Sequence, residues 1–372
     1  GVRVDRVNQF FPQPMGFLDE VHFMNYHLIQ KGNELLSHNT FDVIHAHDWL
    51  VAPSAKVLKH SFQKPLVSTI HATEWGRNNG LHNDLQRHIS DLEWWLTYES
   101  YKVICCSDYM LAELRNIFQV PEDKLTVIGN GVRAQDFSNV HPNLDEWRRN
   151  FATPEEEIVF YVGRHVYEKG VDLLLSAAPK ILSYRPQAKF VIAGKGPLHN
   201  ELKQQAWNLG LGDKVLFVGF VEDVDRNSLY HLADCAVFPS RYEPFGIVAL
   251  EAMAGQAPVI VSDVGGFAET VKHEVNGLTF YAGNSNSLAD NILRVLGDKR
   301  LARKLKEQAW RDVVEKFNWK QIARKTVQSY SQIIRQPSQP SQRKVVYDRY
   351  QVTSGLLERG EQLRESRNHG RW

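Results

Sequence analysis

Short apolar runs alternate with longer amphipathic segments along most of this chain, and no other feature limits the possible folds as strongly. The runs have the length and apolar character of buried strands. They cover residues 41–45, 65–70, 101–105, 124–128, 158–162, 190–193, 215–218, 236–239, 259–261 and 278–281. Strands separated by helices indicate βαβ units, in which a parallel sheet is covered by helices. We therefore expect an α/β fold.

The segments between these runs have helical spacing. Leucine and isoleucine at positions 81, 85, 89, 92 and 96 recur every three or four residues and lie on one helix face. Ser107 directly precedes another such segment and is placed to cap its first turn. At the start of the chain, Val2, Val4 and Val7 resemble a strand already in progress.

Length and local composition divide the chain into domains. A chain of 372 residues is long enough for two domains of ordinary size. Residues 139–157 interrupt the alternation with two prolines and a polar, acidic composition, which is typical of a linker. We expect α/β domains at 1–138 and 158–317, with the crevice between them as the default ligand site. Residues 336–372 begin with a low-complexity linker and continue as a basic tail.

Composition excludes several classes of protein. Hydrophobic residues make up 43% and charged residues 23%, as in an ordinary globular chain, and the net charge is +1. A nucleic-acid-binding surface needs more concentrated positive charge, so we expect no nucleic-acid partner. No apolar run is long enough for a membrane span, although peripheral membrane contact stays open. Three cysteines, two of them adjacent, fit a reducing compartment, and we expect a cytoplasmic protein.

The densest chemical signal is residues 239–253 (PSRYEPFGIVALEAM), which follow an apolar run and open a helix. Glu243 lies in the loop at the carboxyl end of a strand, where α/β sheets bind ligands. Gly246 begins the helix, whose free N–H groups and dipole favour an anion such as phosphate. Glu251, one or two turns into that helix, can still reach a ribose diol. One strand–loop–helix unit thus offers a sugar acceptor, a phosphate cradle and a ribose acceptor.

Arg164 and Lys169 give the second signal. Arg164 follows another strand, Lys169 precedes a helix, and a glycine adjoins each of them. Cleavage of a sugar–phosphate bond leaves a nucleoside diphosphate with growing negative charge. Two fixed cations can stabilise that charge where a metal ion otherwise would.

Together these segments resemble the retaining GT-B glycosyltransferases of family 4. Glu243 and Glu251 are similar to the family's E-x7-E signature, and Arg164 with Lys169 to its phosphate-binding element. Further segments in family order are 194–197, 218–221, 262–266 with Glu269, and 276–278. The resemblance covers about residues 40–335. It implies two Rossmann-like domains that face a crevice, with a C-terminal helix at 318–335 that packs back on the first domain.

The resemblance also implies a reaction. A glycosyl group would move from an ADP-, UDP- or GDP-sugar to a saccharide or another hydroxyl acceptor, with retention of anomeric configuration and no obligatory metal ion. An α-glucan acceptor is one option, because residues 45–49 (HAHDW) are similar to an element of glycogen and starch synthases. The implied catalytic residues are His71, Arg164, Lys169 and Glu243, and the implied donor-binding residues are Asp48, Val221, Phe245, Gly246, Ile247 and Glu251.

Two features depart from the family. Nothing before Phe41 resembles the family's opening strand and glycine-rich loop, so we expect the first domain to lack about two βα units, roughly 60–80 residues. The Asn130-Gly131-Val132 segment matches a family turn that suits positive φ at Gly131, but Arg133 stands where the family has Asp. We assign no catalytic role to that turn.

Alternatives from other classes stay open. His45 and His47 lie two apart on a strand and, with Asp48, could hold a metal ion in a hydrolase. A nucleotide-sugar-binding protein without transfer activity would bind nucleotide but turn over no acceptor. A sugar-nucleotide epimerase of the same fold has less support, because such enzymes need no E-x7-E signature. The D-x-D at 223–225 resembles a metal motif, but Asp at the opening of a helix is typical of a cap.

Overall fold

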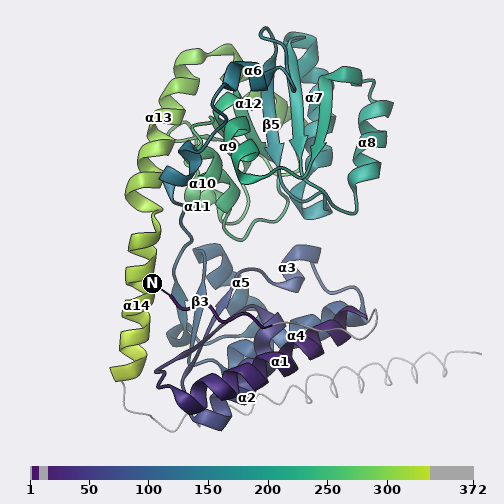
Figure 1. The fold of residues 1–372 in the computed structure, drawn as a ribbon. Coiled ribbons are helices and arrows are strands. Elements are labelled where there is room, and N and C mark those ends of the chain that lie inside the picture. Colours follow the sequence, from purple (N-terminus) through teal and green to yellow (C-terminus); the bar gives the residue numbers. More distant parts are fainter. Residues whose placement is uncertain (1, 8–15, 336–372) are drawn as a thin grey trace, which may run out of the picture. The chain divides into compact units, whose positions relative to one another are not determined.

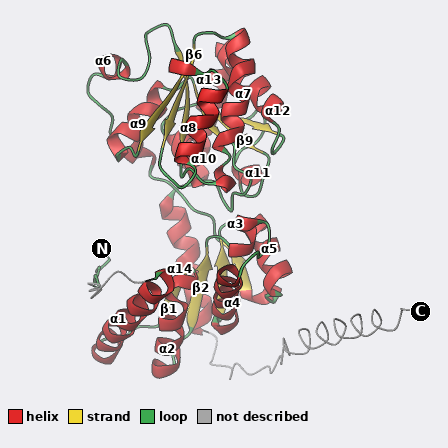
Figure 2. Ribbon diagram, turned by 90° about the vertical axis from the view of Figure 1, so that its right-hand side faces the viewer, coloured by secondary structure: helices red, strands yellow, loops and turns green. Residues whose placement is uncertain are grey.

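The structure, a computed structural model, describes residues 2–7 and 16–335. Its strands form two parallel sheets (Figures 1 and 2). Every strand that the sequence predicts between residues 41 and 281 is confirmed, with ends shifted by at most three residues. The α/β fold is therefore confirmed.

The first sheet has four strands in the order β1-β2-β3-β4. They are β1 (Ile44–His47), β2 (Leu66–Ile70), β3 (Lys102–Cys105) and β4 (Leu125–Val127). Every residue of β2 is buried, which is typical of a strand inside a parallel sheet covered on both faces. The surrounding helices are α1 (Phe17–His38), α2 (Ala52–Phe62), α3 (Glu74–Asn78), α4 (Asp84–Glu99) and α5 (Asp108–Phe118), with 3-10 turns η1 (Trp49–Val51) and η2 (Glu122–Lys124).

The amino-terminal region differs from the expectation. Residues 2–7 form no strand, and Val2 and Val4 are 93% and 70% exposed. Within the described residues β1 is the edge strand of the sheet, and these valines do not pair with it. The first element is instead α1, which packs against α2. The buried side-chain amide of Asn25 on α1 donates to the Leu50 carbonyl at 2.7 Å, which fixes α1 beside η1.

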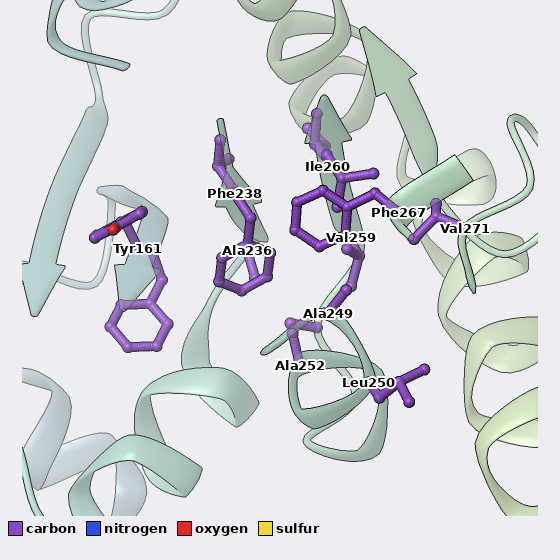
Figure 3. Close-up of a cluster of buried hydrophobic side chains, with 14 of the residues drawn as sticks. Tyr161, Ala236, Phe238, Ala249, Leu250, Ala252, Val259, Ile260, Phe267 and Val271 are labelled. Carbon is purple, nitrogen blue, oxygen red and sulfur yellow. The ribbon is translucent and has the colours of Figure 1, made fainter. Parts of the chain in front are cut away.

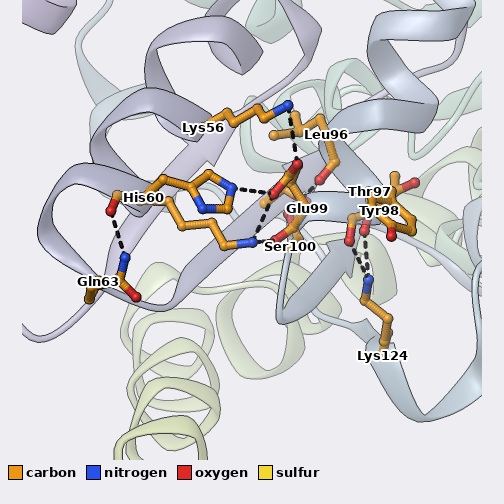
Figure 4. A network of polar contacts seen from close by, with 11 residues as sticks. Lys56, His60, Gln63, Leu96, Thr97, Tyr98, Glu99, Ser100 and Lys124 are labelled. Atoms are coloured by element: carbon orange, nitrogen blue, oxygen red, sulfur yellow. Dashed lines mark hydrogen bonds and ion pairs between the residues drawn. The ribbon is translucent and has the colours of Figure 1, made fainter. Parts of the chain in front are cut away.

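Glu99, at the end of α4, joins that helix to α2 (Figure 4). Its carboxylate accepts hydrogen bonds from Lys59 Nζ and His60 Nε2, both at 2.9 Å, and Lys56 Nζ lies 3.5 Å from the other oxygen. Burial works against the charged form, but these hydrogen bonds hold the pKa of Glu99 below its ordinary value. The cluster therefore stabilises the packing of α2 against α4.

The second sheet has six strands in the order β10-β9-β8-β5-β6-β7. They are β5 (Glu157–Val162), β6 (Ala188–Ala193), β7 (Val215–Gly219), β8 (Cys235–Phe238), β9 (Val259–Ser262) and β10 (Leu278–Phe280). The chain runs outward from β5 to β7 and then returns to β8 on the other side of β5. Such a switch point leaves a crevice at the carboxyl ends of the two central strands, where α/β sheets bind ligands.

Helices connect these strands and enclose an apolar core. They are α7 (Val171–Tyr184), α8 (His199–Asn208), α9 (Asp223–Leu232), α10 (Ile247–Ala254), α11 (Phe267–Thr270) and α12 (Ser285–Gly297), with turns η4 (Tyr167–Lys169) and η5 (Gly212–Lys214). Figure 3 shows Phe238 of β8 and Ile260 of β9 beside Ala249 of α10 and Phe267 of α11, all buried. Burying a phenylalanine side chain contributes roughly 1.5–3 kcal/mol, so this packing fixes α10 against the sheet.

The segment 139–157, expected as a linker, follows turn η3 (Ala134–Ser138) and contains a short helix, α6 (Leu144–Arg148). His141 Nε2 lies 2.7 Å from Asp225 Oδ1 on α9, and the His141 ring stacks on Trp147 with centroids 4.5 Å apart. The segment is therefore folded onto the second half of the chain and is not an extended connection.

Two long helices, α13 (Lys299–Lys316) and α14 (Trp319–Arg335), follow the second sheet. Ile322 and Ile333 of α14 form a small apolar cluster with Val67 of β2 and Ile104 of β3. The described chain therefore ends on the first sheet.

Gly131 does not have the positive φ expected from the turn motif. A Cβ at this position would lie 2.7 Å from the carbonyl oxygen of Phe317, just after α13. The neighbouring Val132 amide donates to the same carbonyl at 2.8 Å. Glycine is required here for close backbone approach, and the prediction of a left-handed turn is wrong.

No helix of the described residues is both long enough and apolar enough to span a membrane. The linker and tail expected at 336–372 lie outside the described residues.

Candidate functional site

Two loops meet at the switch point of the second sheet. The loop after β5 carries Arg164 and Lys169, and the loop after β8 carries Glu243. Because β5 and β8 are adjacent and parallel, both loops leave the same edge of the sheet. The Arg241 amide donates to the Glu168 carbonyl at 2.8 Å, which ties the loops together.

Gly170 makes this approach possible. Its φ is +67°, and a Cβ would lie 1.9 Å from the carbonyl oxygen of Pro239. Any side chain at this position would push the two loops apart. The glycine beside Lys169 therefore sets the position of that lysine against the loop after β8.

Lys169 and Glu243 form an ion pair, with Nζ 2.8 Å from Oε2. Ser240 Oγ donates to the same carboxylate oxygen at 3.2 Å. Glu243 is only 7% exposed, so the added hydrogen bond helps to offset the cost of burying its charge. The pair holds a cation and a carboxylate in fixed positions at the sheet edge. Such a pair can bind an anion and a hydroxyl group side by side.

Arg164 lies on the same loop as Lys169 but is much more exposed. Its side chain is 58% exposed, and its guanidinium lies 3.0 Å from the Glu168 carboxylate. An exposed pair of this kind contributes at most about 1 kcal/mol. The guanidinium can therefore turn toward an incoming anion at little cost.

The amino end of α10 points its unpaired N–H groups away from the helix. Gly246 stands at the N-cap with φ +92°, and no side chain caps the helix. A Cβ on Gly246 would lie 2.4 Å from the Phe267 ring, so both space and conformation require glycine. The Ala249 amide donates to the Gly246 carbonyl at 3.0 Å, which leaves the N–H groups of Ile247 and Val248, together with the helix dipole, to favour an anion.

The remaining donor-binding candidates have different environments. The Phe245 side chain is buried in the core beside Gly129, so only its backbone can face a ligand. Glu251 is half-buried on the second turn of α10, and burial raises its pKa although Arg226 of α9 works in the opposite direction. Val221 follows β7 at the same carboxyl edge, directly before α9. Glu251 and Val221 thus both lie next to α9.

His71 and Asp48 follow neighbouring strands of the first sheet, β2 and β1. The Asp48 carboxylate accepts a hydrogen bond from the His71 amide at 2.8 Å. Asp48 has φ +60°, a conformation that non-glycine residues seldom adopt, and its own amide is held by the Thr69 carbonyl at 3.0 Å. The His71 ring contacts His47, with Nε2 and Nδ1 3.0 Å apart. Strained backbone of this kind is often found at functional sites.

His45 and His47 do lie on one face, and their rings stack with centroids 4.4 Å apart. However, both ring nitrogens of His45 contact protein hydroxyls, with Nε2 2.7 Å from Thr69 Oγ1 and Nδ1 at Tyr330 Oη. Burial, with the nearby His47 and His71, lowers the pKa of His45 to about 4. Among the described residues no group of three or more His, Cys, Asp or Glu side chains could hold a metal ion. The hydrolase alternative therefore has no supporting geometry.

The D-x-D at 223–225 has a structural role. The N-cap of α9 is Glu222, which makes no side-chain capping bond, so the prediction of an aspartate cap is wrong. Asp223 instead pairs with Arg226 at 2.9 Å, and Asp225 contacts His141 at 2.7 Å. Both carboxylates are used to hold α9 and the segment before it.

Tyr242, which the sequence analysis did not single out, connects the two sheets' loops. Its hydroxyl donates to Glu113 Oε1 at 2.8 Å, and Thr73 Oγ1 donates to the same oxygen at 2.6 Å. The ring leaves no room for a Cβ on Gly76, which would lie 2.4 Å away. Tyr242 precedes Glu243, and Thr73 lies two residues after His71. One buried side chain therefore joins the loops that carry these two candidates.

Two further contacts support the same junction. Ser107 Oγ donates to the Pro244 carbonyl at 2.5 Å and accepts from the Met110 amide, which confirms Ser107 as the cap of α5. The Glu269 carboxylate accepts from the amides of Asp108 and Tyr109, at 3.0 and 2.8 Å. The first turn of α5 is thus bound by residues of the second half of the chain. Such long-range pairings have no local signal in the sequence.

The comparisons with known proteins agree with this geometry. The family model described as Glycosyltransferase Family 4 matches residues 3–136, and the one described as Glycosyl transferases group 1 matches residues 144–312. A glycosyltransferase of Methanocaldococcus jannaschii is 40% identical over 88% of this chain and 85% of its own length. The chain belongs to the GT-B glycosyltransferases of family 4. A glycogen synthase of Mycobacterium tuberculosis is 37% identical to this glycosyltransferase over 81% of the chain and 71% of the relative.

Solved structures show the same fold. Sucrose-phosphate synthase from Thermosynechococcus elongatus superposes with a TM-score of 0.75 at 27% identity, covering 88% of this chain and 82% of that chain. Anabaena Alr3699/HepE in complex with UDP and glucose gives a TM-score of 0.71 at 23% identity, over 86% and 84% of the two chains.

The family match extends beyond the motifs, which cover about residues 40–335. It begins at residue 3, while the expected lack of the opening strand and glycine-rich loop stays a prediction. Among the described residues before Phe41, Phe17–His38 form α1. A helix preserves apolar spacing more than a fixed motif, which is why no motif revealed the match.

Proposed function

We propose that this glycosyltransferase moves a glycosyl group from a nucleotide-diphosphate sugar to a saccharide hydroxyl, with retention of anomeric configuration. The observation that carries the proposal is the arrangement at the switch point. A cation and a carboxylate, Lys169 and Glu243, are fixed 2.8 Å apart next to the loop that ends at the uncapped amino end of α10. This combination suits a sugar attached to a diphosphate.

Each candidate takes a role that its environment allows. Lys169 and the more exposed Arg164 hold the diphosphate, together with the N–H groups at Gly246 and Ile247. Glu243 accepts hydrogen bonds from hydroxyls of the donor sugar. Figure 1 locates α10, whose second turn carries Glu251 for the ribose hydroxyls.

Three further residues complete the donor site in this proposal. The backbone of Val221 meets the base, and the backbone of Phe245 lines the diphosphate. His71 shapes the transfer site from the first sheet, and Asp48 holds the His71 amide at 2.8 Å. The neutral rings around His71 fit a position beside an uncharged sugar.

In the proposed reaction, the bond between the anomeric carbon and the diphosphate oxygen breaks. A new bond forms from the acceptor oxygen on the same face, and the acceptor proton passes to the departing diphosphate. Lys169 and Arg164 stabilise the charge that grows on the leaving group. Because two cations already serve this purpose, we propose that no metal ion is obligatory.

We further propose a glucosyl donor and an α-glucan acceptor. Support comes from the glycogen synthase relative at 37% identity and from residues 45–49, where Asp48 and His47 are held next to His71. A nucleotide-sugar-binding protein without transfer activity is the second candidate. A cytoplasmic location fits the three cysteines, which are all free and buried.

Calorimetric titration with ADP, UDP and GDP, with and without EDTA, tests the donor site. We expect one nucleotide to bind in EDTA, weakened about tenfold or more in Arg164→Ala and unchanged in Arg87→Ala, an exposed arginine on α4. Binding of none of the three would contradict the proposed site. Incubation with the matching nucleotide glucose and a glucan then separates the two candidates, because only a transferase releases the nucleoside diphosphate. NMR of the new linkage reports retention or inversion.

A further inference from the structure

A groove lies along α13, on the opposite side of the second sheet from the donor loops. It has a volume of about 580 Å³, and Arg300, Arg303, Lys304 and Arg311 line it together with Glu274 and Glu307. Glu274 belongs to the loop directly before β10. Because all strands are parallel, this loop lies at the amino ends of the strands, whereas the donor loops follow the carboxyl ends. The groove is therefore separate from the candidate donor site.

The helix places these cations together. Arg300, Arg303, Lys304 and Arg311 are spaced by three, one and seven residues, and residues three, four, seven and eleven apart share one face of an α-helix. Four positive side chains therefore form a single stripe, and the groove runs along it. Like charges at this spacing repel each other, which costs free energy unless an anion lies between them.

The arginines of the stripe lack the carboxylate partners that other α13 cations have. Lys299 pairs with Asp234 at 3.0 Å, and Lys316 with Asp312 at 2.7 Å. In the part of the chain that the structure describes, no carboxylate lies within 4.0 Å of Arg300, Arg303 or Arg311. The guanidinium groups of Arg300 and Arg303 are available to a ligand, whereas Arg311 Nε contacts the Glu307 carbonyl at 3.4 Å.

The two carboxylates of the groove do not neutralise it. The Glu274 carboxylate is already paired with Arg294 of α12, and this hydrogen bond lowers the pKa of Glu274. The Lys304 amine contacts only the Glu274 carbonyl, at 3.4 Å. Glu307 is then the remaining carboxylate beside the four cations that line the groove. The groove therefore has a clear excess of positive charge.

This excess is part of a larger asymmetry. Residues 299–335 contain eleven Lys and Arg but only three Asp and Glu, whereas the whole chain has a net charge of +1. The rest of the chain is therefore acidic. Positive charge concentrated on these two helices attracts anions to them and is indicative of an anionic partner.

We propose that this groove binds a phosphoryl group, as a second anion site distinct from the donor site. Arginine presents a planar fork of donors that matches phosphate oxygens, and several arginines in one hollow favour a dianion over a carboxylate. The ligand is a soluble phosphate ester or the phosphoryl headgroup of a lipid. This inference does not depend on the proposed function, because none of its residues lies in the loops after β5 or β8.

Titration of the full chain with inorganic phosphate, followed through the arginine Nε–Hε signals in NMR spectra, tests the site directly. We expect the Arg300 and Arg303 signals to shift with saturation. In Arg300→Gln/Arg303→Gln the affinity for phosphate should fall about tenfold. The control, Lys306→Gln/Lys320→Gln, removes the same charge from α13 and α14 outside the groove and should keep the wild-type affinity. Arg164→Gln reports phosphate bound at the donor site and should leave the groove signals unchanged.

A second arm distinguishes the two sources of the phosphoryl group. Vesicles of phosphatidylcholine with phosphatidic acid are sedimented with each variant. Sedimentation lost only in the groove variant supports a lipid headgroup, and phosphate saturation without sedimentation supports a soluble ester. Equal losses in the groove and control variants would mean unspecific charge attraction and would overturn the proposal. So would binding that depends only on Arg164, or no binding in either arm.

Discussion

The carboxyl ends of the two sheets carry different polar clusters, one built from histidines and the other from charged side chains. On the first sheet, His45, His47 and His71 contact one another and nearby hydroxyls, and burial lowers the pKa of His45 to about 4. On the second sheet, Lys169 and Glu243 form an ion pair with Arg164 close by. In the proposed function, the first cluster lies beside the uncharged sugar and the second one binds the diphosphate.

The largest effect on the charged cluster is expected from a substitution of Lys169. Lys169→Ala removes the cation from the second cluster and leaves Glu243 buried without its partner. We expect kcat/KM to fall by about 10² to 10³, the effect of removing one electrostatic donor from a transition state. Steady-state kinetics with the nucleotide sugar that binds would measure it.

Lys203→Ala is the matched control, because Lys203 is an exposed lysine on α8. It should keep kcat/KM. A Lys169→Ala enzyme with normal turnover would show that the charged cluster serves stability and not the donor.

Glu93 is a further buried group of the first domain whose uncharged form is favoured. It is buried on α4 and accepts hydrogen bonds from the Glu74 amide at the start of α3, at 2.9 and 3.1 Å. Burial raises its pKa from 4.5 to about 8. Folding therefore favours the protonated acid, and this contribution is complete below pH 4.5 and lost as the pH rises through about 8.

Through this group alone, the free energy of unfolding should then fall by roughly 4 kcal/mol from pH 5 to pH 9 in the wild type. Glu93→Gln carries no titrating proton at this position and should fall by less. Denaturant titrations at both pH values would measure the difference. Parallel curves for the two proteins would mean that Glu93 is charged in the folded state at neutral pH.

His45 should give the opposite pH dependence. Its pKa is lowered from 6.5 to about 4, so folding favours the neutral ring. This contribution is complete above pH 6.5 and is lost as the pH falls through about 4. We expect the wild type to lose about 1–2 kcal/mol more stability than His45→Asn between pH 7 and pH 4.

Thermal unfolding at the two pH values, with His38→Asn as a control for an exposed histidine on α1, would measure this loss. An NMR titration of the His45 ring with a midpoint near 6.5 would contradict the neutral cluster.

Much of the fold could be predicted because its signals are local. Apolar runs located each strand after residue 41, and Gly246 with Glu243 marked the loop and helix after β8. The strand order could not be predicted, since the switch between β5 and β8 is a long-range property. The structure of residues 2–7 and of α1 was also missed, because alternating valines are compatible with an extended segment that pairs with no strand.

The candidate site, too, could be predicted only where its signals are local. Lys169 and Glu243 could be placed near one another because each follows a predicted strand, but the 2.8 Å contact depends on Gly170 and on neighbouring strands. The positive φ of Asp48 has no signature in an aspartate. The carbonyl oxygen of Phe317, which Gly131 accommodates, is nearly two hundred residues away in the sequence.

The smallest expected effect falls on the residue that links the two clusters. Tyr242→Phe keeps the ring against Gly76 but removes the hydroxyl that donates to Glu113 at 2.8 Å. A lost buried hydrogen bond costs about 1–2 kcal/mol, so the protein should stay folded with a slightly lower melting temperature. If Tyr242 positions Glu243 relative to His71, kcat should fall several-fold while the affinity for the free nucleoside diphosphate is kept. Tyr184→Phe, on an exposed tyrosine of α7, is the control and should leave kcat unchanged. A stability loss with unchanged kcat would show that the two clusters act independently and that Tyr242 only packs the junction.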